Sequence, residues 1–317
     1  MSEHVRLGPG REFDAVRALV DVWGESAVGI GDDAAILDVP PGSRLLVSTD
    51  STVEGIHFRR EWLDPEEIGW RATMAALSDL AAMGASPLGF LLALTVPDGW
   101  RDHLGEVAKG IGAAAAQSGT RIVGGDLNAG EKLSLGITVL GHAPRPLTRA
   151  GARPGDTLYL TGTLGGPGAA LASWKRGGRP RAEDRARFAH PEARLAAGEW
   201  FAREGARAAI DISDGLAGDA AHLAAASGVR CVLHLEAIPC APGVSAREAL
   251  VSGEEYELLV AAPALDSEAF VAAHRGLSLR AIGTVEAAAD GDAGSVVAAE
   301  GGRRIELPTG HDHFAAR

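Results

Sequence analysis

The chain has 317 residues, 46% of them hydrophobic, which is long enough for two packed domains and too apolar for a disordered polypeptide. Its formal net charge is −12 and no basic run stands out, which excludes nucleic acid as a partner because that binding needs clustered Lys and Arg. Cys231 and Cys240 match no zinc spacing and no disulfide framework, so both are expected to be free thiols.

The first ten residues lack the basic-then-apolar pattern of a signal peptide. The most apolar span, residues 74–96, contains Asp79, Gly84 and Pro87, which argues against a membrane-spanning helix. We therefore expect no membrane partner and a cytoplasmic location.

Hydrophobic periodicity and breaker residues predict helices and strands in both halves of the chain. Asp64 and Pro65 predict a helix start, as N-cap and first helical residue. In the first half, the expected helices are residues 11–22, 65–83 and 102–118, and the expected strands are 45–53, 89–96 and 133–142.

Three prolines in "APRPLTRAGARPGDTLYLTG" predict a domain boundary near residues 143–150. The sequence beyond it alternates again. The expected helices are 168–175, 192–204, one ending at 227, 245–251 and 267–274. The expected strands are one entering "IDISDG", then 230–238, 256–263 and 279–285, with a polar loop at 177–184. We predict two α+β domains, residues 1–145 and 146–317.

Five short acidic segments stand in apolar surroundings. In "GIGDDAAIL", Asp32 and Asp33 are adjacent, and burial there would require a partner because an unpaired buried carboxylate is unfavourable. The two-residue strand period puts Ser48 and Asp50 of "VSTDST" on one face. Asp79 lies on the apolar face of its helix, with only Ala and Met three and four positions away.

The other two segments resemble these. Asp126 follows a strand and a glycine pair in "RIVGGDLNAG". In "IDISDG", Asp211 and Ser213 share a strand face and Asp214 ends the strand. Asp126 and Asp214 could simply form turns, as could the Asp32–Asp33 pair. A buried salt bridge could explain Asp79, but no Lys or Arg lies within four residues of it.

Taken together, oxygen-rich segments without histidine or thiolate partners are typical of sites for hard cations such as Mg²⁺. Glycine pairs beside the acids would let backbone N–H groups approach phosphates. The chain contains neither a Walker sequence nor the kinase HRD and DFG motifs, so phosphoryl transfer here would need a different fold.

The chain resembles the thiamine-monophosphate kinase family, within the aminoimidazole ribonucleotide synthetase superfamily. The motifs "GIGDDAAIL", "STDSTVEGIHF", "LSDLAAMGASP", "GGD", "LTRAGARPGD", "DISDGL", "SGEEYEL" and a terminal "DHF" carry the resemblance over nearly the whole chain. It implies an N-terminal sheet domain that pairs across a homodimer, a C-terminal α+β domain, and ATP-dependent phosphorylation of thiamine monophosphate to thiamine diphosphate.

The resemblance also implies roles for individual residues. Several Mg²⁺ ions would be bound by Asp33, Ser48, Thr49, Asp50, Asp79, Asp126, Asp211 and Asp214. ATP would contact Gly125, Asp126, Arg149 and Ser213, and thiamine monophosphate would contact His57 and Glu254. The acceptor phosphate is already ionised at neutral pH, so no general base is expected.

The sequence departs from the family pattern at three places. "GGDLN" stands where the family often has GGDTT, "SGEEYEL" where it often has GGEDYEL, and His311 where an aromatic residue usually precedes DHF. We place His311 at the substrate, where an aromatic ring would stack on thiamine. The alternatives are another ATP-dependent enzyme of the superfamily, in purine synthesis or hydrogenase maturation, and a non-enzymatic nucleotide or metal sensor.

Overall fold

The structure is a computed structural model that describes residue 4 and residues 10–31, 33–289, 293–301 and 303–307. The chain divides into two compact units. Unit 1 comprises Met1–Leu80 and Ala85–Pro144, and unit 2 comprises Ala81–Gly84 and Arg145–Arg317.

Unit 1 contains a four-stranded sheet with the strand order β1-β4-β2-β3. The strands are β1 (Arg44–Val53), β2 (Ser86–Val96), β3 (Ile122–Ala129) and β4 (Ser134–Ala143). β4 is antiparallel to both β1 and β2, whereas β2 and β3 are parallel. The sheet therefore has two edges, β1 and β3, and both carry residues of the candidate site.

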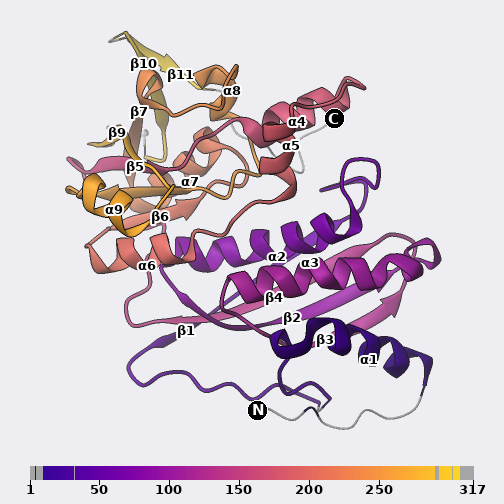
Figure 1. The fold of residues 1–317 in the computed structure, drawn as a ribbon. Helices are drawn as coiled ribbons and strands as arrows, with labels where there is room; N and C mark the ends of the chain where they lie inside the picture. Colours follow the sequence, from indigo (N-terminus) through magenta and orange to yellow (C-terminus); the bar gives the residue numbers. More distant parts are fainter. Residues whose placement is uncertain (1–3, 5–9, 32, 290–292, 302, 308–317) are drawn as a thin grey trace. The chain divides into compact units, whose positions relative to one another are not determined.

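The helices of unit 1 are α1 (Arg11–Trp23), α2 (Pro65–Ala82) and α3 (Leu104–Gln117), with 3₁₀ turns η1 (Gly24–Ser26) and η2 (Asp98–His103). α2 and α3 lie side by side along the sheet (Figure 1). α2 begins at Pro65 as predicted, and the Glu67 carboxylate accepts the Asp64 N–H at 2.9 Å, which caps its first turn.

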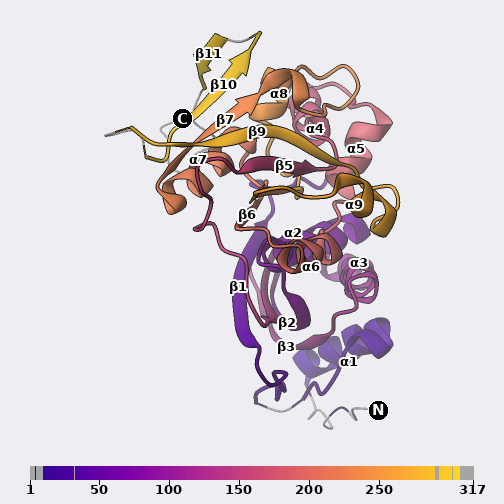
Figure 2. The same ribbon diagram turned by 90° about the vertical axis from the view of Figure 1, so that its left-hand side faces the viewer.

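Unit 2 contains a seven-stranded sheet with the order β11-β10-β7-β9-β5-β8-β6. The strands are β5 (Thr157–Thr161), β6 (Ala208–Asp211), β7 (Val229–His234), β8 (Leu258–Ala262), β9 (Leu279–Ala287), β10 (Val296–Glu300) and β11 (Arg303–Glu306). Figure 2 shows β9 between β5 and β7. Only β10 and β7 pair in parallel among these strands.

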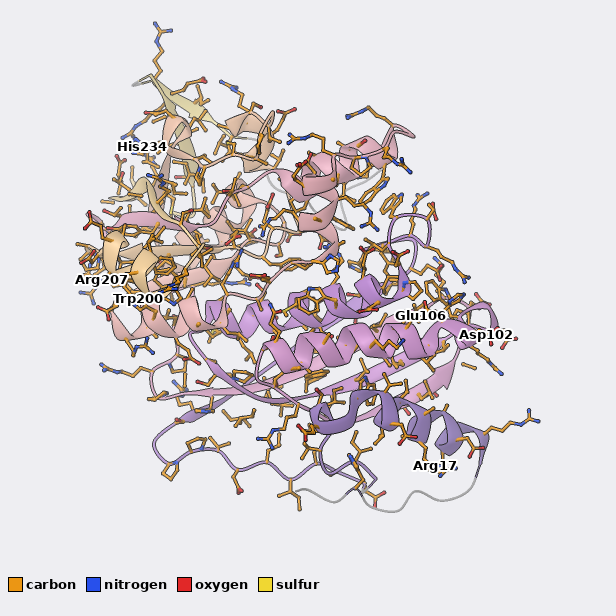
Figure 3. All side chains as sticks on the ribbon, in the orientation of Figure 1. Arg17, Asp102, Glu106, Trp200, Arg207 and His234 are labelled. Atoms are coloured by element: carbon orange, nitrogen blue, oxygen red, sulfur yellow. The ribbon has the colours of Figure 1, made fainter. Side chains whose placement is uncertain are left out.

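The helices of unit 2 are α4 (Gly166–Lys175), α5 (Ala182–Ala189), α6 (Leu195–Arg203), α7 (Leu216–Ser227), α8 (Ala246–Leu250) and α9 (Ser267–Ala273), with η3 (Leu235–Ala237). Trp200 of α6, labelled in Figure 3, packs edge-on against Phe270 of α9, with 5.2 Å between ring centroids. Arg207, also labelled, forms a 2.6 Å ion pair with buried Asp156.

The expected α+β architecture is confirmed, and most predicted elements lie within a few residues of the observed ones. Two expectations were wrong in detail: the predicted helix at 102–118 is split into η2 and α3, and the polar loop predicted at 177–184 runs into α5. β10 and β11 were not predicted. Cys231 and Cys240 are both free thiols. Within the described ranges, the longest apolar helices fall short of what a bilayer crossing requires.

Candidate functional site

The first group of candidate residues lies along β1, at one edge of the sheet in unit 1. Leu46 and Thr52 are buried, Ser48 and Asp50 are half-buried, and the residues between them are exposed. Ser48 and Asp50 therefore share a face, as the strand period predicted. The Asp50 carboxylate also accepts the Ser51 N–H at 2.7 Å.

Thr49 points to the other face of β1. Its hydroxyl lies 3.0 Å from the Thr138 hydroxyl of β4, and the residue is exposed. The structure thus separates the Thr49 side chain from Ser48 and Asp50, so only the main-chain oxygen of Thr49 could join those two residues at one ion.

Asp79 comes to the same face from α2. It is half-buried on a helix whose other residues nearby are buried, and its carboxylate accepts a hydrogen bond of 2.5 Å from the Ser48 hydroxyl. The sequence showed no Lys or Arg close to Asp79, and the structure provides the Ser48 hydroxyl of β1 as a hydrogen-bond partner. One hydroxyl does not neutralise a carboxylate, so the charge remains available to a cation.

Asp33 lies in the segment between η1 and β1, which contains no helix or long strand. The expectation of a buried acid pair is wrong for Asp33: the residue is exposed, as are Ala34 and Ala35, and Ile36 is 94% exposed. The unfavourable burial for which the sequence singled out this carboxylate therefore does not apply to Asp33. Asp32 lies outside the described residues.

Asp33 lines a hollow of about 760 Å³ together with residues of β3, the other sheet edge. Gly125 and Asp126 line it from β3, and the Phe13 and Trp23 side chains of α1 add apolar surface. A Cβ on Gly125 would lie 2.1 Å from the Leu92 carbonyl oxygen, so only glycine fits there.

Asp126 lies inside β3, opposite Ala93 of β2, rather than after the strand as predicted. It is exposed, and its carboxylate accepts a hydrogen bond from the Asn128 amide. Residues two apart share a strand face, so Asn128 occupies a position from which it can orient Asp126. The turn-forming alternative for Asp126 does not apply.

His57 lies in the turn after β1 and is half-buried. Its Nδ1 accepts the Val53 N–H at 3.0 Å. The neutral ring therefore carries its proton on Nε2, which makes that atom a donor for an anionic ligand.

In unit 2, the candidate residues lie where β6 ends and α7 begins. Asp211 is buried at the end of β6, whereas Ser213 and Asp214 are half-buried in the loop that follows and not on the strand as predicted. Asp219, in the first turn of α7, accepts the N–H groups of Ser213, Asp214 and Gly215, each at 3.1 Å. One buried carboxylate thus fixes the main chain of the loop.

The same loop concentrates negative charge. Burial, together with the neighbouring Asp211 and Asp214 carboxylates, raises the pKa of Asp219 to about 7. The carboxylates of Asp211 and Asp214 thus disfavour the ionised form of Asp219, and a cation nearby would offset this effect. Sequence reasoning missed Asp219, although an acidic residue in the first turn of a helix is a recognisable signal.

Arg149 lies apart from this loop. Its carbonyl accepts a 2.9 Å hydrogen bond from Ser227, the last residue of α7. Ser213 and Asp214 precede the first residue of that helix, and twelve helical residues span about 18 Å. The structure therefore does not place the main chain of Arg149 beside Ser213, and any shared ligand would have to extend between them.

Glu254 lies in the segment 252–257, which packs against the loop just described. The Glu254 N–H donates to the Ser213 carbonyl at 2.7 Å, and the Glu254 carboxylate accepts from the Tyr256 hydroxyl at 2.5 Å. Glu254 is half-buried and Tyr256 is buried. The two candidate segments of unit 2 are thus joined by main-chain hydrogen bonds.

Two buried carboxylates of this segment, Glu255 and Glu257, are structural. Glu257 accepts hydrogen bonds from Arg187 and Arg194, and Arg194 holds the pKa of Glu257 below its ordinary value although burial opposes this. Glu255 accepts from the Gly165 N–H and the Ser252 hydroxyl, each at 2.5 Å. The Gly165 N–H, at the N-cap of α4, is therefore already hydrogen-bonded to Glu255.

The remaining candidate, His311, lies outside the described residues. Within the described part of the chain, no three His, Cys, Asp or Glu side chains come together as a preformed metal site. The candidate carboxylates are instead divided between unit 1 and unit 2, with hydroxyl groups beside them in each.

Comparison with known proteins covers both units. The model of the AIR synthase related protein N-terminal domain matches residues 31–143, and that of the C-terminal domain matches residues 153–294. The thiamine-monophosphate kinase of Escherichia coli (strain K12) is 35% identical, over an alignment that covers 96% of each chain.

Two solved structures resemble this one. AaThiL complexed with AMPPCP and TMP is 28% identical, with a TM-score of 0.75 over 99% of this chain and 100% of that one. The hydrogenase maturation protein HypE in complex with ATP has a TM-score of 0.79 over 96% of each chain, but at 22% identity this likeness concerns the fold alone.

Proposed function

Because the chain belongs to the thiamine-monophosphate kinase family of AIR synthase related proteins, we propose that it phosphorylates thiamine monophosphate to thiamine diphosphate with ATP. The observation that carries the proposal is identity of 35% over 96% of the chain, which includes the acidic segments of both units. The solved relative that holds AMPPCP and TMP supports the same pair of substrates.

Unit 1 would bind the nucleotide phosphates at the β3 edge. Gly125 lines the hollow together with Asp33 and Asp126, and packing against the Leu92 main chain of β2 requires glycine at this position. The Phe13 and Trp23 side chains offer apolar surface to the nucleoside. The exposed guanidinium of Arg149, in unit 2, would contact the nucleotide at a separate point.

The donor set fits magnesium. Ser48, Asp50 and Asp79 share one region of unit 1 and offer only oxygen atoms, which Mg²⁺ prefers. In unit 2, burial and the neighbouring Asp211 and Asp214 carboxylates raise the pKa of Asp219, and a cation near that loop would offset this concentration of negative charge. Bound Mg²⁺ would neutralise the charge of the phosphate oxygens and so reduce the repulsion between donor and acceptor phosphates.

The chain's own contribution is position rather than proton transfer. Asp219 fixes the main chain of residues 213–215, so the Ser213 side chain would be held in position for the nucleotide and the Asp214 side chain for a cation. His57 would donate from Nε2 to the phosphate of thiamine monophosphate, and Glu254 would bind the thiamine moiety. Reaction of one ionised phosphate with another by direct in-line transfer requires no general base.

A second copy of this chain would cover the open face of the sheet in unit 1. Leu45 and Val47 are 52% and 59% exposed although they are large hydrophobic residues of the edge strand β1. Exposed apolar side chains on a sheet edge are typical of an interface, and we propose a homodimer. We also propose a cytoplasmic location, which suits free thiols and a need for ATP.

One assay tests the proposal against its alternatives. Purified protein is incubated with ATP, Mg²⁺ and thiamine monophosphate, and thiamine diphosphate is measured by chromatography. Formation of thiamine diphosphate that stops when Mg²⁺ is chelated supports the kinase. Nucleotide binding without turnover would indicate a sensor, and ATP consumption only with other superfamily substrates would indicate another enzyme.

A further inference from the structure

The segment 252–257 contains an unusual stretch of backbone. Glu254 has a φ of 64° and Tyr256 a φ of 54°, and they are the non-glycine residues with positive φ in the described part of the chain. Side chains disfavour this left-handed conformation, which persists only where the surroundings impose it.

Hydrogen bonds to residues 212–213 impose it here. The Glu254 N–H donates to the Ser213 carbonyl at 2.7 Å, and the Tyr256 N–H donates to the Ile212 carbonyl at 2.8 Å. Gly253 lies so close that a Cβ would stand 2.7 Å from the Ser213 carbonyl oxygen. The strained residues are thus held against the loop that carries Ser213 and Asp214.

The two left-handed residues place the Tyr256 hydroxyl on the Glu254 carboxylate. Tyr256 is only 7% exposed, and its hydroxyl donates to Glu254 Oε2 at 2.5 Å. A buried tyrosine ring has few accessible orientations, whereas a glutamate side chain has several and must lose them when it binds a ligand. The ring therefore holds the carboxylate in one orientation before any ligand arrives.

We propose that Tyr256 is a positioning residue that orients the Glu254 carboxylate for thiamine monophosphate, an inference that rests on the proposed role of Glu254 at the substrate. Tyr256 acts through Glu254 and not on the substrate. It should therefore govern binding of thiamine monophosphate and leave both ATP binding and turnover unchanged.

Tyr256→Phe tests this, because it removes one hydroxyl and keeps the ring. The KM for thiamine monophosphate should rise about three- to tenfold, while kcat and the KM for ATP change less than about twofold. Tyr159→Phe is the matched control. Tyr159 is also 7% exposed and its hydroxyl accepts the Leu265 N–H at 3.0 Å, so it reports the general effect of removing a buried hydroxyl in unit 2.

A double-mutant cycle with Glu254→Gln separates the positioning role of Tyr256 from the substrate-binding role of Glu254. If Tyr256 acts through Glu254, the added Tyr256→Phe change should have little effect in the glutamine variant. Equal effects in both backgrounds, equal effects of the two tyrosine variants, or loss of folding in Tyr256→Phe would overturn the positioning role alone. An unchanged KM for thiamine monophosphate in Glu254→Gln would overturn the proposed role of Glu254 as well.

Discussion

Replacing Glu255 by glutamine should remove the loss of folding stability that ionisation of Glu255 causes as the pH rises towards 7. Glu255 is 2% exposed, and its Oε1 accepts from the Gly165 N–H and the Ser252 hydroxyl. Its Oε2 is buried without a hydrogen bond in the described structure, and the nearest cationic atom, Arg187 Nη2, lies 3.8 Å away. Burial therefore raises the pKa of Glu255 to about 7, against the lowering effect of Ser252.

The direction of the effect follows from proton binding. The folded state binds this proton more tightly than the unfolded chain, whose carboxyl has its ordinary pKa of 4.5. Ionisation therefore favours unfolding, and the stability present at low pH is lost as the pH rises towards 7. With 1.36 kcal/mol for each tenfold difference in proton affinity, this group should remove roughly 2–3 kcal/mol between about pH 5 and pH 8.

Urea unfolding at those two pH values, followed by tryptophan fluorescence, measures the loss in wild type and in Glu255→Gln. The glutamine side chain keeps an acceptor for Gly165 and Ser252 but cannot ionise, so the variant should lose about 2 kcal/mol less than wild type over this range. The matched control is Glu257→Gln. Arg194 lowers the pKa of Glu257, so that variant should be less stable than wild type near neutral pH. The same pH dependence in wild type and Glu255→Gln would refute the reasoning.

Three further substitutions test the site. Asp79→Asn should abolish turnover without weakening the fold, because the half-buried carboxylate accepts a hydrogen bond from the Ser48 hydroxyl that an asparagine oxygen can also accept. Retained activity, or full stabilisation by Mg²⁺ and ATP in thermal melts, would contradict this. His57→Ala should raise the KM for thiamine monophosphate more than that for ATP in steady-state kinetics, and the reverse would move His57 to the nucleotide. Glu254→Gly should be more stable than Glu254→Ala by about 1 kcal/mol in urea unfolding, because φ is 64° and both variants lack the carboxylate; the opposite order would show that the backbone is not strained.

Local patterns predicted much of the fold because they report local physics. The Asp64–Pro65 start of α2 and the shared face of Ser48 and Asp50 follow from capping and strand geometry within a few residues. The β10–β11 hairpin was missed although only two glycines separate its strands in sequence, which is a local hairpin signal. The pairing of β10 with β7, by contrast, joins residues more than sixty positions apart. Such pairing depends on contacts that no local window contains.

In the candidate site, too, the sequence predicted local features but not contacts between residues far apart in the chain. Asp79 was recognised because a carboxylate on an apolar helix face needs an explanation, but its partner Ser48 lies 31 residues away. Asp33 was expected to be buried from its apolar neighbours, yet it is exposed because that segment forms no regular element. Tyr256 could not be found from sequence, since its effect on Glu254 depends on a left-handed backbone that local propensity disfavours.

The most direct test of the proposed kinase is the fate of the γ-phosphoryl group. ATP made chiral at its γ-phosphorus is incubated with the protein, Mg²⁺ and thiamine monophosphate, and the configuration of the transferred group is determined in the product. Direct in-line transfer predicts that the group is found in thiamine diphosphate, in equal amount to ADP and with inverted configuration. Retained configuration, or appearance of the group only as inorganic phosphate, would contradict the account.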